Sequence, residues 1–367
     1  MSEPVIRNRR LPRLAATIRD VARASRVSTA TVSRVFNDSP LVSVETRERV
    51  RAAASRLGYW PNSIARSLIT NRTHMVGVLM PDLHGEFFSE ILHGVDLKAR
   101  ACGLHILVSR SSSSAEELVG ALRSMRGRVD GLIVMAPDLE DPATLAGRVG
   151  EVPTVYLNPD GGVRSGDTLS IENVEGARQV VSHLIGLGHR RIAMITGPDR
   201  NIDARQRREG YRSALREASI PFEPRLEFAG DFSERSGYEA MLAILRHEPR
   251  PTALFAANDY MAVGAIGALH DHDRRVPEDL AVAGFDDIPL ARYLTPPLTT
   301  VHVDMLRFGE RAVELLRERT TGPRTAARHD VLETRLVVRG SCGAHGGGEG
   351  PNRWNRGQTS RDPRASS

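Results

Sequence analysis

Residues 28–37, STATVSRVFN, combine side-chain types that contact nucleic acids at the spacing of a helix. Val32 and Val35 are spaced to face inward, which leaves Arg34 on the opposite face. An arginine there can donate two hydrogen bonds to guanine, and small side chains such as Thr29 and Ala30 can contact a thymine methyl. The other polar side chains suit phosphate oxygens, which fix the register of a protein on DNA; these are Ser28, Thr31, Ser33 and Asn37.

The surrounding residues predict the elements that would position this helix. Thr17 can cap a preceding short helix, and Ser28 can cap the helix that carries Arg34. A third helix is expected after Ser43 and should end at Gly58. Two short helices joined by a tight turn and supported by a third make a helix-turn-helix domain, here over residues 17–60. The plainer alternative is a small three-helix core with ordinary polar caps.

The charge of the chain is unevenly distributed. Residues 1–72 hold 14 arginines against five acidic residues, a net charge of +9, whereas the remaining residues carry −4. Residues 1–16 are expected to form a flexible basic arm. A basic head on an acidic body favours contact between the head and a polyanion, although a solvated arginine-rich terminus would show the same count.

Several protein classes lack their signatures here. Lys98 is the only lysine and does not stand in a phosphate-binding loop, while Cys102 and Cys342 are too few for a disulfide framework or a cysteine-rich zinc site. The 12 histidines form no ligand cluster, and neither a GxGxxG turn after a strand nor a nucleophile elbow is present. We therefore expect no enzyme, no cofactor and no metal. Without a signal peptide or a membrane-spanning run, the expected location is cytoplasmic, with no membrane partner.

Short apolar runs alternate with amphipathic stretches from residue 75 onward, which indicates buried parallel strands joined by helices. Two tandem series predict two doubly wound α/β subdomains, with strands at 75–80, 104–108, 131–135 and 153–157, then at 191–196, 225–230, 253–258 and 280–285. Helices are expected at 203–218, 233–246 and 304–319, and further strands at 299–304 and 335–338. Residues 341–367 are expected to be a disordered tail, since no Leu, Ile or Val occurs after Gly343.

Two segments of the basic head, TVSRVFN at 31–37 and YWPNSIARSL at 59–68, resemble the LacI/GalR family of bacterial transcriptional regulators. The resemblance extends over about residues 17–342. It implies a hinge helix and linker at 61–73 that folds on DNA, pairs with its mate in a dimer and enters the minor groove. The implied hinge contacts are Asn62, Ala65 and Leu68, with the leucine wedged into a base step at a cost of a few kcal/mol.

The body, residues 74–340, is also similar to this family, in segments such as ALFAANDYMAVGAIGAL and VAGFDD. The resemblance implies two lobes of the periplasmic-binding-protein type that bind an effector and dimerise. A ligand between the lobes, at the carboxyl ends of the strands, is also the location that open parallel sheets favour. The implied effector contacts are Glu86, Phe87, Phe88, Ser111, Asn158, Arg207, Phe232, Asn258 and Asp286.

These side chains have the chemistry of a sugar site, because amides, carboxylates and guanidinium groups bond hydroxyls and aromatic rings cover apolar faces. Two departures from the family pattern affect the identity of the ligand. His84-Gly85-Glu86 stands where the family often has Ser-Asn-Pro, and Arg208 replaces an apolar residue. Phe87 and Phe88 could equally belong to the core, and Asp259 and Asp287 are expected to cap the elements that follow them.

The resemblance therefore implies a repressor whose affinity for a pseudo-palindromic DNA operator is controlled by a small molecule, a sugar or a related polyol or nucleobase. A homodimer is expected, because the tail contains no leucine that could form a tetramerising helix. Inducer and corepressor roles for the effector both remain open. The rival class is a sugar-binding receptor of a transporter, which would share the body but would lack residues 17–68.

Overall fold

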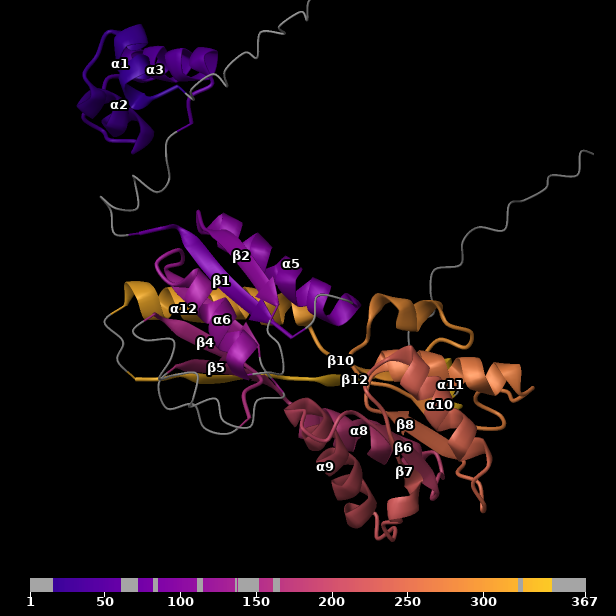
Figure 1. The fold of residues 1–367 in the computed structure, drawn as a ribbon. Helices are drawn as coiled ribbons and strands as arrows, with labels where there is room; N and C mark the ends of the chain where they lie inside the picture. The colour runs from indigo at the N-terminus through magenta and orange to yellow at the C-terminus, as the bar shows by residue number, and fades with distance from the viewer. Residues whose placement is uncertain are drawn as a thin grey trace, which may run out of the picture. The chain divides into compact units, whose positions relative to one another are not determined.

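The computed structural model describes residues 16–60, 72–81, 85–110, 115–135, 137, 152–160, 166–322 and 326–344. The chain divides into two compact units between Thr73 and His74. Each unit has its own hydrophobic core. We call the first unit the head and the second the body (Figure 1).

Three short helices form the head, as the sequence predicted: α1 (Ile18–Ser25), α2 (Thr29–Phe36) and α3 (Val44–Leu57). Each begins where a hydroxyl can accept a hydrogen bond from a free amide. Thr17 and Asp20 form a capping box, Ser28 accepts from the Thr31 amide at 3.1 Å, and Ser43 accepts from the Thr46 amide at 3.3 Å. A glycine in the left-handed conformation, Gly58, ends α3. The fully buried valines of the core are Val21, Val32, Val35 and Val50.

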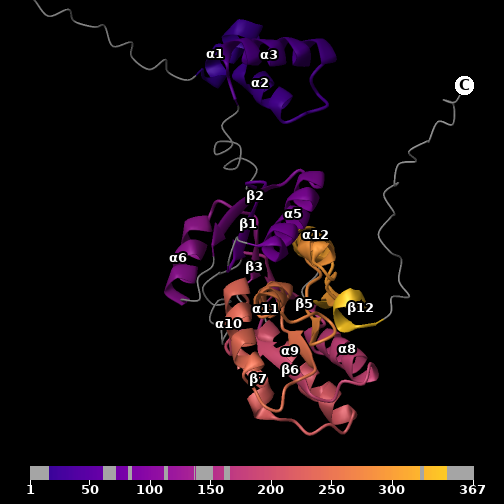
Figure 2. The ribbon, with the colours of Figure 1, turned by 90° about the vertical axis from the view of Figure 1, so that its right-hand side faces the viewer.

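The first lobe of the body contains a six-stranded parallel sheet in the order β11-β5-β4-β3-β1-β2. Helices α5 and α12 cover one face of this sheet and α6 covers the other (Figure 2). The core alternates along each strand: in β1, Val76 and Val78 belong to the cluster that includes residues of α5 and α12, whereas Leu79 belongs to the cluster that includes residues of α6. The strands are β1 (Met75–Met80), β2 (His105–Arg110), β3 (Gly131–Met135), β4 (Thr154–Leu157), β5 (Asp167–Ile171) and β11 (His329–Leu332); the helices are α5 (Glu86–Ala101), α6 (Ala115–Met125) and α12 (Met305–Thr321).

The second lobe contains a four-stranded parallel sheet in the order β7-β6-β8-β9. Helices α8 and α9 pack together, as do α10 and α11 (Figure 1). The strands are β6 (Ile192–Thr196), β7 (Glu227–Ala229), β8 (Ala253–Ala256) and β9 (Ala281–Ala283); the helices are α8 (Asn173–Gly186), α9 (Ile202–Glu217), α10 (Glu234–Leu245) and α11 (Asp259–Asp271), with 3-10 helices η1 (Pro224–Leu226) and η2 (Pro289–Tyr293).

The two lobes are assembled from interleaved segments of the chain. After the second lobe, an antiparallel pair of strands, β10 (Thr300–His302) and β12 (Arg335–Val337), brackets a return to the first lobe. In that return, α12 packs against α5, and β11 pairs with β5 at the edge of the first sheet. The sequence predicted α12 but neither β5 nor β11, because both strands mix polar residues with few apolar ones.

One predicted boundary is wrong. Ser341 and Cys342 were assigned to the disordered tail, but both are buried in the 3-10 helix η3 (Gly340–Cys342). The Ser341 hydroxyl donates to the Val282 carbonyl at 2.6 Å and accepts from the Thr299 amide at 2.8 Å. The tail prediction relied on large apolar residues, and here polar side chains satisfy buried backbone groups instead. Residues 345–367 lie outside the described part of the chain.

Helices α5 and α12 pack against each other closely enough for their backbones to touch. A Cβ atom on Gly94 would lie 2.0 Å from the Leu306 carbonyl oxygen, and one on Gly309 would lie 2.1 Å from the Ile91 carbonyl oxygen. Only glycine lets the two helices approach this closely.

We therefore expect Gly94→Ala to destabilise the body by about 2 kcal/mol or more, because the added methyl group meets backbone that cannot move aside. The control is Gly120→Ala in α6, where a Cβ atom would meet nothing within 4 Å. That substitution should stabilise the body by about 0.5 to 1 kcal/mol through higher helix propensity. Urea unfolding of the full chain measures both, and equal midpoints for Gly94→Ala and the wild type would contradict the helix contact.

Candidate DNA-reading helix and effector cleft

Helix α2 presents its predicted DNA-facing side chains to solvent. Thr29, Ala30 and Arg34 are exposed, whereas Val32 and Val35 on the other side are fully buried. The Arg34 side chain makes no hydrogen bond or ion pair to another described residue, so its exposed guanidinium group is accessible to a ligand.

Other arginines of the head are engaged within the protein. Arg49 donates to the Ser25 carbonyl at 3.0 Å, and Arg51 pairs with Asp38 at 2.9 Å. Arg47 donates to the Ser39 carbonyl at 3.0 Å. These contacts hold α3 against the rest of the head. Arg34 belongs to α2 instead and has an exposed side chain.

The predicted phosphate-contacting side chains are partly used in capping. Ser28 Oγ accepts from the Thr31 amide and lies 2.9 Å from Thr31 Oγ1, while Asn37 donates to Ser33 Oγ at 3.5 Å. Ser28 and Asn37 are nevertheless exposed, and Thr31 and Ser33 are partly exposed. The predicted hinge contacts Asn62, Ala65 and Leu68, and Ser111 of the predicted effector site, lie outside the described residues.

A cavity of about 630 Å³ lies between the two lobes of the body, at the carboxyl ends of their strands. We call it the effector cleft. Its volume is within the usual range for small-molecule sites. Six predicted effector contacts line it: Phe87, Phe88, Arg207, Phe232, Asn258 and Asp286. The sequence did not predict several further lining residues, among them Asn201, Asp203 and Tyr260.

Arg207 and Asp286 form a buried ion pair at the cleft, with 3.0 Å between Nη2 and Oδ1 and side-chain exposures of 3% and 5%. The guanidinium group also donates to Asn173 Oδ1 at 2.9 Å and to the Ala257 carbonyl at 2.7 Å. It stacks on the Phe285 ring, 3.8 Å from the centroid. Arg207 is thus held rigidly by groups from several elements.

Asp286 is unusual in both conformation and ionisation. Its φ angle is +108°, in a region of backbone conformation that residues other than glycine rarely adopt. Burial raises the pKa of the Asp286 carboxyl to about 6, with Arg207 opposing the shift. Oδ1 makes no hydrogen bond of good geometry to the described residues, although it contacts Arg207. A ligand hydroxyl is the kind of donor that would satisfy this oxygen.

Asn258, and not Asp259, caps α11. Asn258 Oδ1 accepts from the Met261 amide at 3.0 Å, and its Nδ2 donates to the Phe232 carbonyl at 3.0 Å. Both groups of the amide are therefore used inside the protein, although the residue lines the cleft. Its contacts fix the backbone at Phe232, whose φ angle of +71° turns the chain at the cleft wall.

The capping predictions for Asp259 and Asp287 were wrong. Asp259 is fully buried and accepts from the Thr300 hydroxyl at 2.6 Å and the Ile288 amide at 2.9 Å. Burial raises the pKa of its carboxyl well above the ordinary value. Asp287 instead pairs with Arg339 at 2.6 Å and with His302 at 2.9 Å. Sequence spacing could not show these partners, because they come from distant segments.

Two predicted effector contacts, Glu86 and Asn158, lie outside the described lining of the cleft. Glu86 begins α5, and its carboxylate accepts from the Leu290 amide at 3.4 Å. Asn158 is 3% exposed and follows β4 with a φ angle of +44°. Its Oδ1 accepts from the Ile171 amide at 3.0 Å, which ties the end of β4 to β5.

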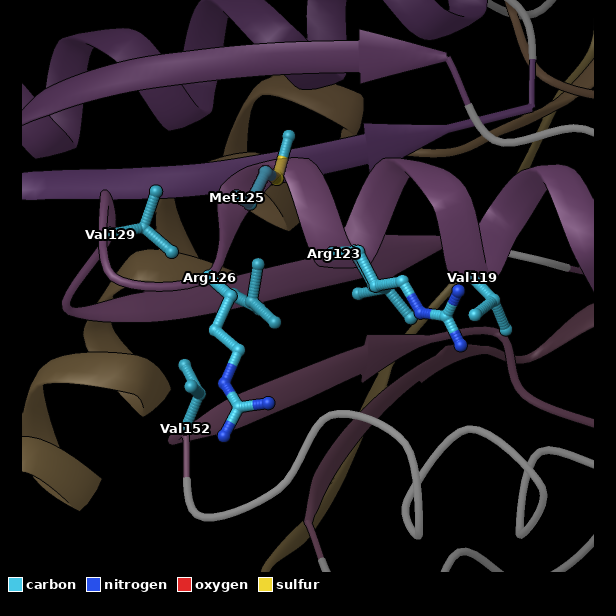
Figure 3. Close-up of a pocket in the computed structure, with 8 residues that line it drawn as sticks. Val119, Arg123, Met125, Arg126, Val129 and Val152 are labelled. Atoms are coloured by element: carbon cyan, nitrogen blue, oxygen red, sulfur yellow. The ribbon is translucent and has the colours of Figure 1, made fainter.

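A second cavity of about 290 Å³ lies under α6 in the first lobe (Figure 3). Apolar side chains such as Val119, Val129 and Val152 form its walls, and Arg123 and Arg126 extend beside it. It shares no lining residue with the effector cleft. Within the described ranges, no group of three or more His, Cys, Asp or Glu residues could hold a metal ion, and no helix is long and apolar enough to cross a membrane.

Comparison with known proteins gives the class of protein that this head and body define. The model of bacterial regulatory proteins of the lacI family matches residues 17–62, and that of a periplasmic binding protein-like domain matches residues 181–342. The ribose operon repressor of Escherichia coli K12 is 38% identical over 329 residues, 89% of this chain and 100% of the relative.

Solved structures similar to this chain also include regulators of the LacI type. The lac repressor dimer bound to operator and the anti-inducer ONPF is 32% identical with a TM-score of 0.81, covering 90% of this chain and 99% of that one. A LacI-family regulator from Enterococcus faecium with bound ribose is 26% identical with a TM-score of 0.66, covering 73% and 98%. The chain belongs to the LacI family of bacterial regulatory proteins. It is a DNA-binding transcriptional repressor under effector control, and not an enzyme.

The raised pKa of Asp286 gives a pH prediction. The folded carboxyl keeps its proton to higher pH than the unfolded one, so the contribution of Asp286 to the stability of the wild type falls as pH rises from about 4 to about 6. Asp286→Asn lacks this loss. The difference in unfolding free energy between variant and wild type should therefore change by roughly 2 to 3 kcal/mol in favour of the variant across that window. Urea titrations at each pH measure it; parallel stability curves would contradict the raised pKa.

Proposed function

We propose that this repressor acts as a homodimer in the cytoplasm and binds a pseudo-palindromic operator with one α2 helix in each half-site. The observation that supports this most directly is the exposed side chain of Arg34 on a helix face that is backed by buried valines. Docking of such a helix in the major groove places its first residues on base edges. The dimer structure of the lac repressor on its operator supports the symmetry.

We further propose an uncharged sugar as the effector. The Asp286 carboxylate and the Arg207 guanidinium group offer an acceptor and a donor to hydroxyls, and Phe87, Phe88 and Phe232 offer aromatic faces. Arg207 is already neutralised by Asp286, so little positive charge remains for an anionic ligand. The ribose seen in the Enterococcus faecium relative supports this class of ligand.

The role of Arg34 is tested by Arg34→Ala in a binding-site selection followed by affinity measurements. We expect a loss of roughly 1 to 3 kcal/mol and relaxed preference at one base pair of each half-site. The control Arg56→Ala removes the same charge from α3 and should weaken binding without changing sequence preference. An unchanged base preference in Arg34→Ala would contradict the base-reading role of Arg34.

The effector proposal is tested by thermal unfolding with a panel of uncharged mono- and disaccharides that includes D-ribose. At least one should raise the melting temperature of the wild type, because a ligand that binds only the folded state stabilises it. Asp286→Ala should lose that shift and still bind operator. If no sugar in the panel stabilises the wild type, or if Asp286→Ala responds as the wild type does, the proposed ligand site is wrong.

A further inference from the structure

Helix α5 of the first lobe is capped by a side chain of the second lobe. The residue before α5 is Gly85, which has no side chain to accept from the first free amides of the helix. The Tyr260 hydroxyl accepts from the Glu86 amide at 2.6 Å instead, from 174 residues along the chain. Tyr260 stands in the first turn of α11 and lines the effector cleft.

The contact is reciprocal. The Glu86 carboxylate of the first lobe accepts from the Leu290 amide of the second lobe at 3.4 Å, in the first turn of η2. Each lobe therefore supplies an acceptor to the start of a helix in the other lobe. We call these three residues, Glu86, Tyr260 and Leu290, the clasp.

Gly85 makes room for the clasp. Its φ angle is +86°, and a Cβ atom at this position would lie 3.2 Å from the Tyr260 ring. The tyrosine ring thus packs directly on the glycine backbone, in the part of the chain where this sequence departs from the usual family pattern. Gly85 and Glu86, which differ from the family pattern, thus make contacts between the lobes. Neither residue has to touch a ligand to do so.

A second link joins the lobes at a separate place. The Ile202 amide, at the start of α9, donates to the Pro137 carbonyl after β3 at 3.1 Å. Near it, Arg205 of α9 pairs with Asp160, which follows β4. Both bonds can exist only while the lobes are together, because their partners belong to different lobes.

We propose that the clasp favours the closed arrangement of the two lobes, so that Glu86 and Tyr260 are positioning residues that set the open–closed equilibrium of the cleft. An effector can change this equilibrium only through its different affinity for the two states. A ligand that fits beside Tyr260 keeps the clasp, whereas one that displaces the tyrosine opens it. The consequence for DNA binding rests on the proposed function, but the clasp itself does not.

The test is hydrogen exchange of the full-length protein without ligand, comparing the wild type with Tyr260→Phe. The readout is the Ile202 amide, which the substituted residue does not touch. If the clasp keeps the lobes closed, losing the tyrosine hydroxyl should speed exchange of this amide about fivefold, as expected for one hydrogen bond. The matched control is Tyr238→Phe, which removes a hydroxyl bonded to Asp271 at 3.0 Å within the second lobe.

Faster exchange at both Glu86 and Ile202 in Tyr260→Phe, with neither changed in Tyr238→Phe, supports the proposal. Faster exchange at Glu86 alone overturns it, because Tyr260 would then only cap α5. Unchanged exchange at both amides overturns it as well. Operator binding by the same wild-type sample is measured separately, so failure of the DNA-binding role is distinguishable from failure of the clasp.

Discussion

The body has to keep the charged guanidinium group of Arg207 buried in the lining of its cleft. A buried charge is costly unless it is paired and hydrogen-bonded. Arg207 meets that requirement with Asp286, Asn173, the Ala257 carbonyl and the Phe285 ring. These partners come from the start of α8 and from the ends of β8 and β9, so neutralising one side chain fixes the relative positions of the elements that form the second wall of the cleft.

The same need for partners explains the strained backbone around the cleft. The φ angles of Phe232, Asp286 and Asp287 are all positive, and contacts from distant segments hold each residue in place. The Phe232 carbonyl receives the Asn258 amide, and Asp287 is pinned by Arg339 and His302. Such strain persists where surrounding bonds over-determine the conformation, and it presents side chains to a ligand in a fixed geometry.

Sequence reasoning was reliable where a pattern is local. The cap at Ser28, the start of a third helix after Ser43, its end at Gly58 and the apolar strands at 75–80 and 131–135 are each set by neighbouring residues, and the structure places them as predicted. It was less reliable where the partner is remote. β5 and β11 lack a strong apolar signal because polar residues occupy several of their positions, although β5 is largely buried. Asn258 caps α11 in place of Asp259, which instead accepts from Thr300 and Ile288, far along the chain. Tyr260 gave no local signal for a contact with Glu86.

The interleaved path of the chain has a consequence for the order in which the protein can fold during synthesis. The head has a core of its own and is complete once the chain up to residue 60 has emerged from the ribosome. The first lobe follows the head in sequence, but its sheet gains its edge strand β11, and α5 its packing partner α12, only after the second lobe has been made. The DNA-reading domain can therefore form first, whereas the lobe nearest to it in sequence is completed last. A nascent chain would have a folded head before it has the body that regulates it.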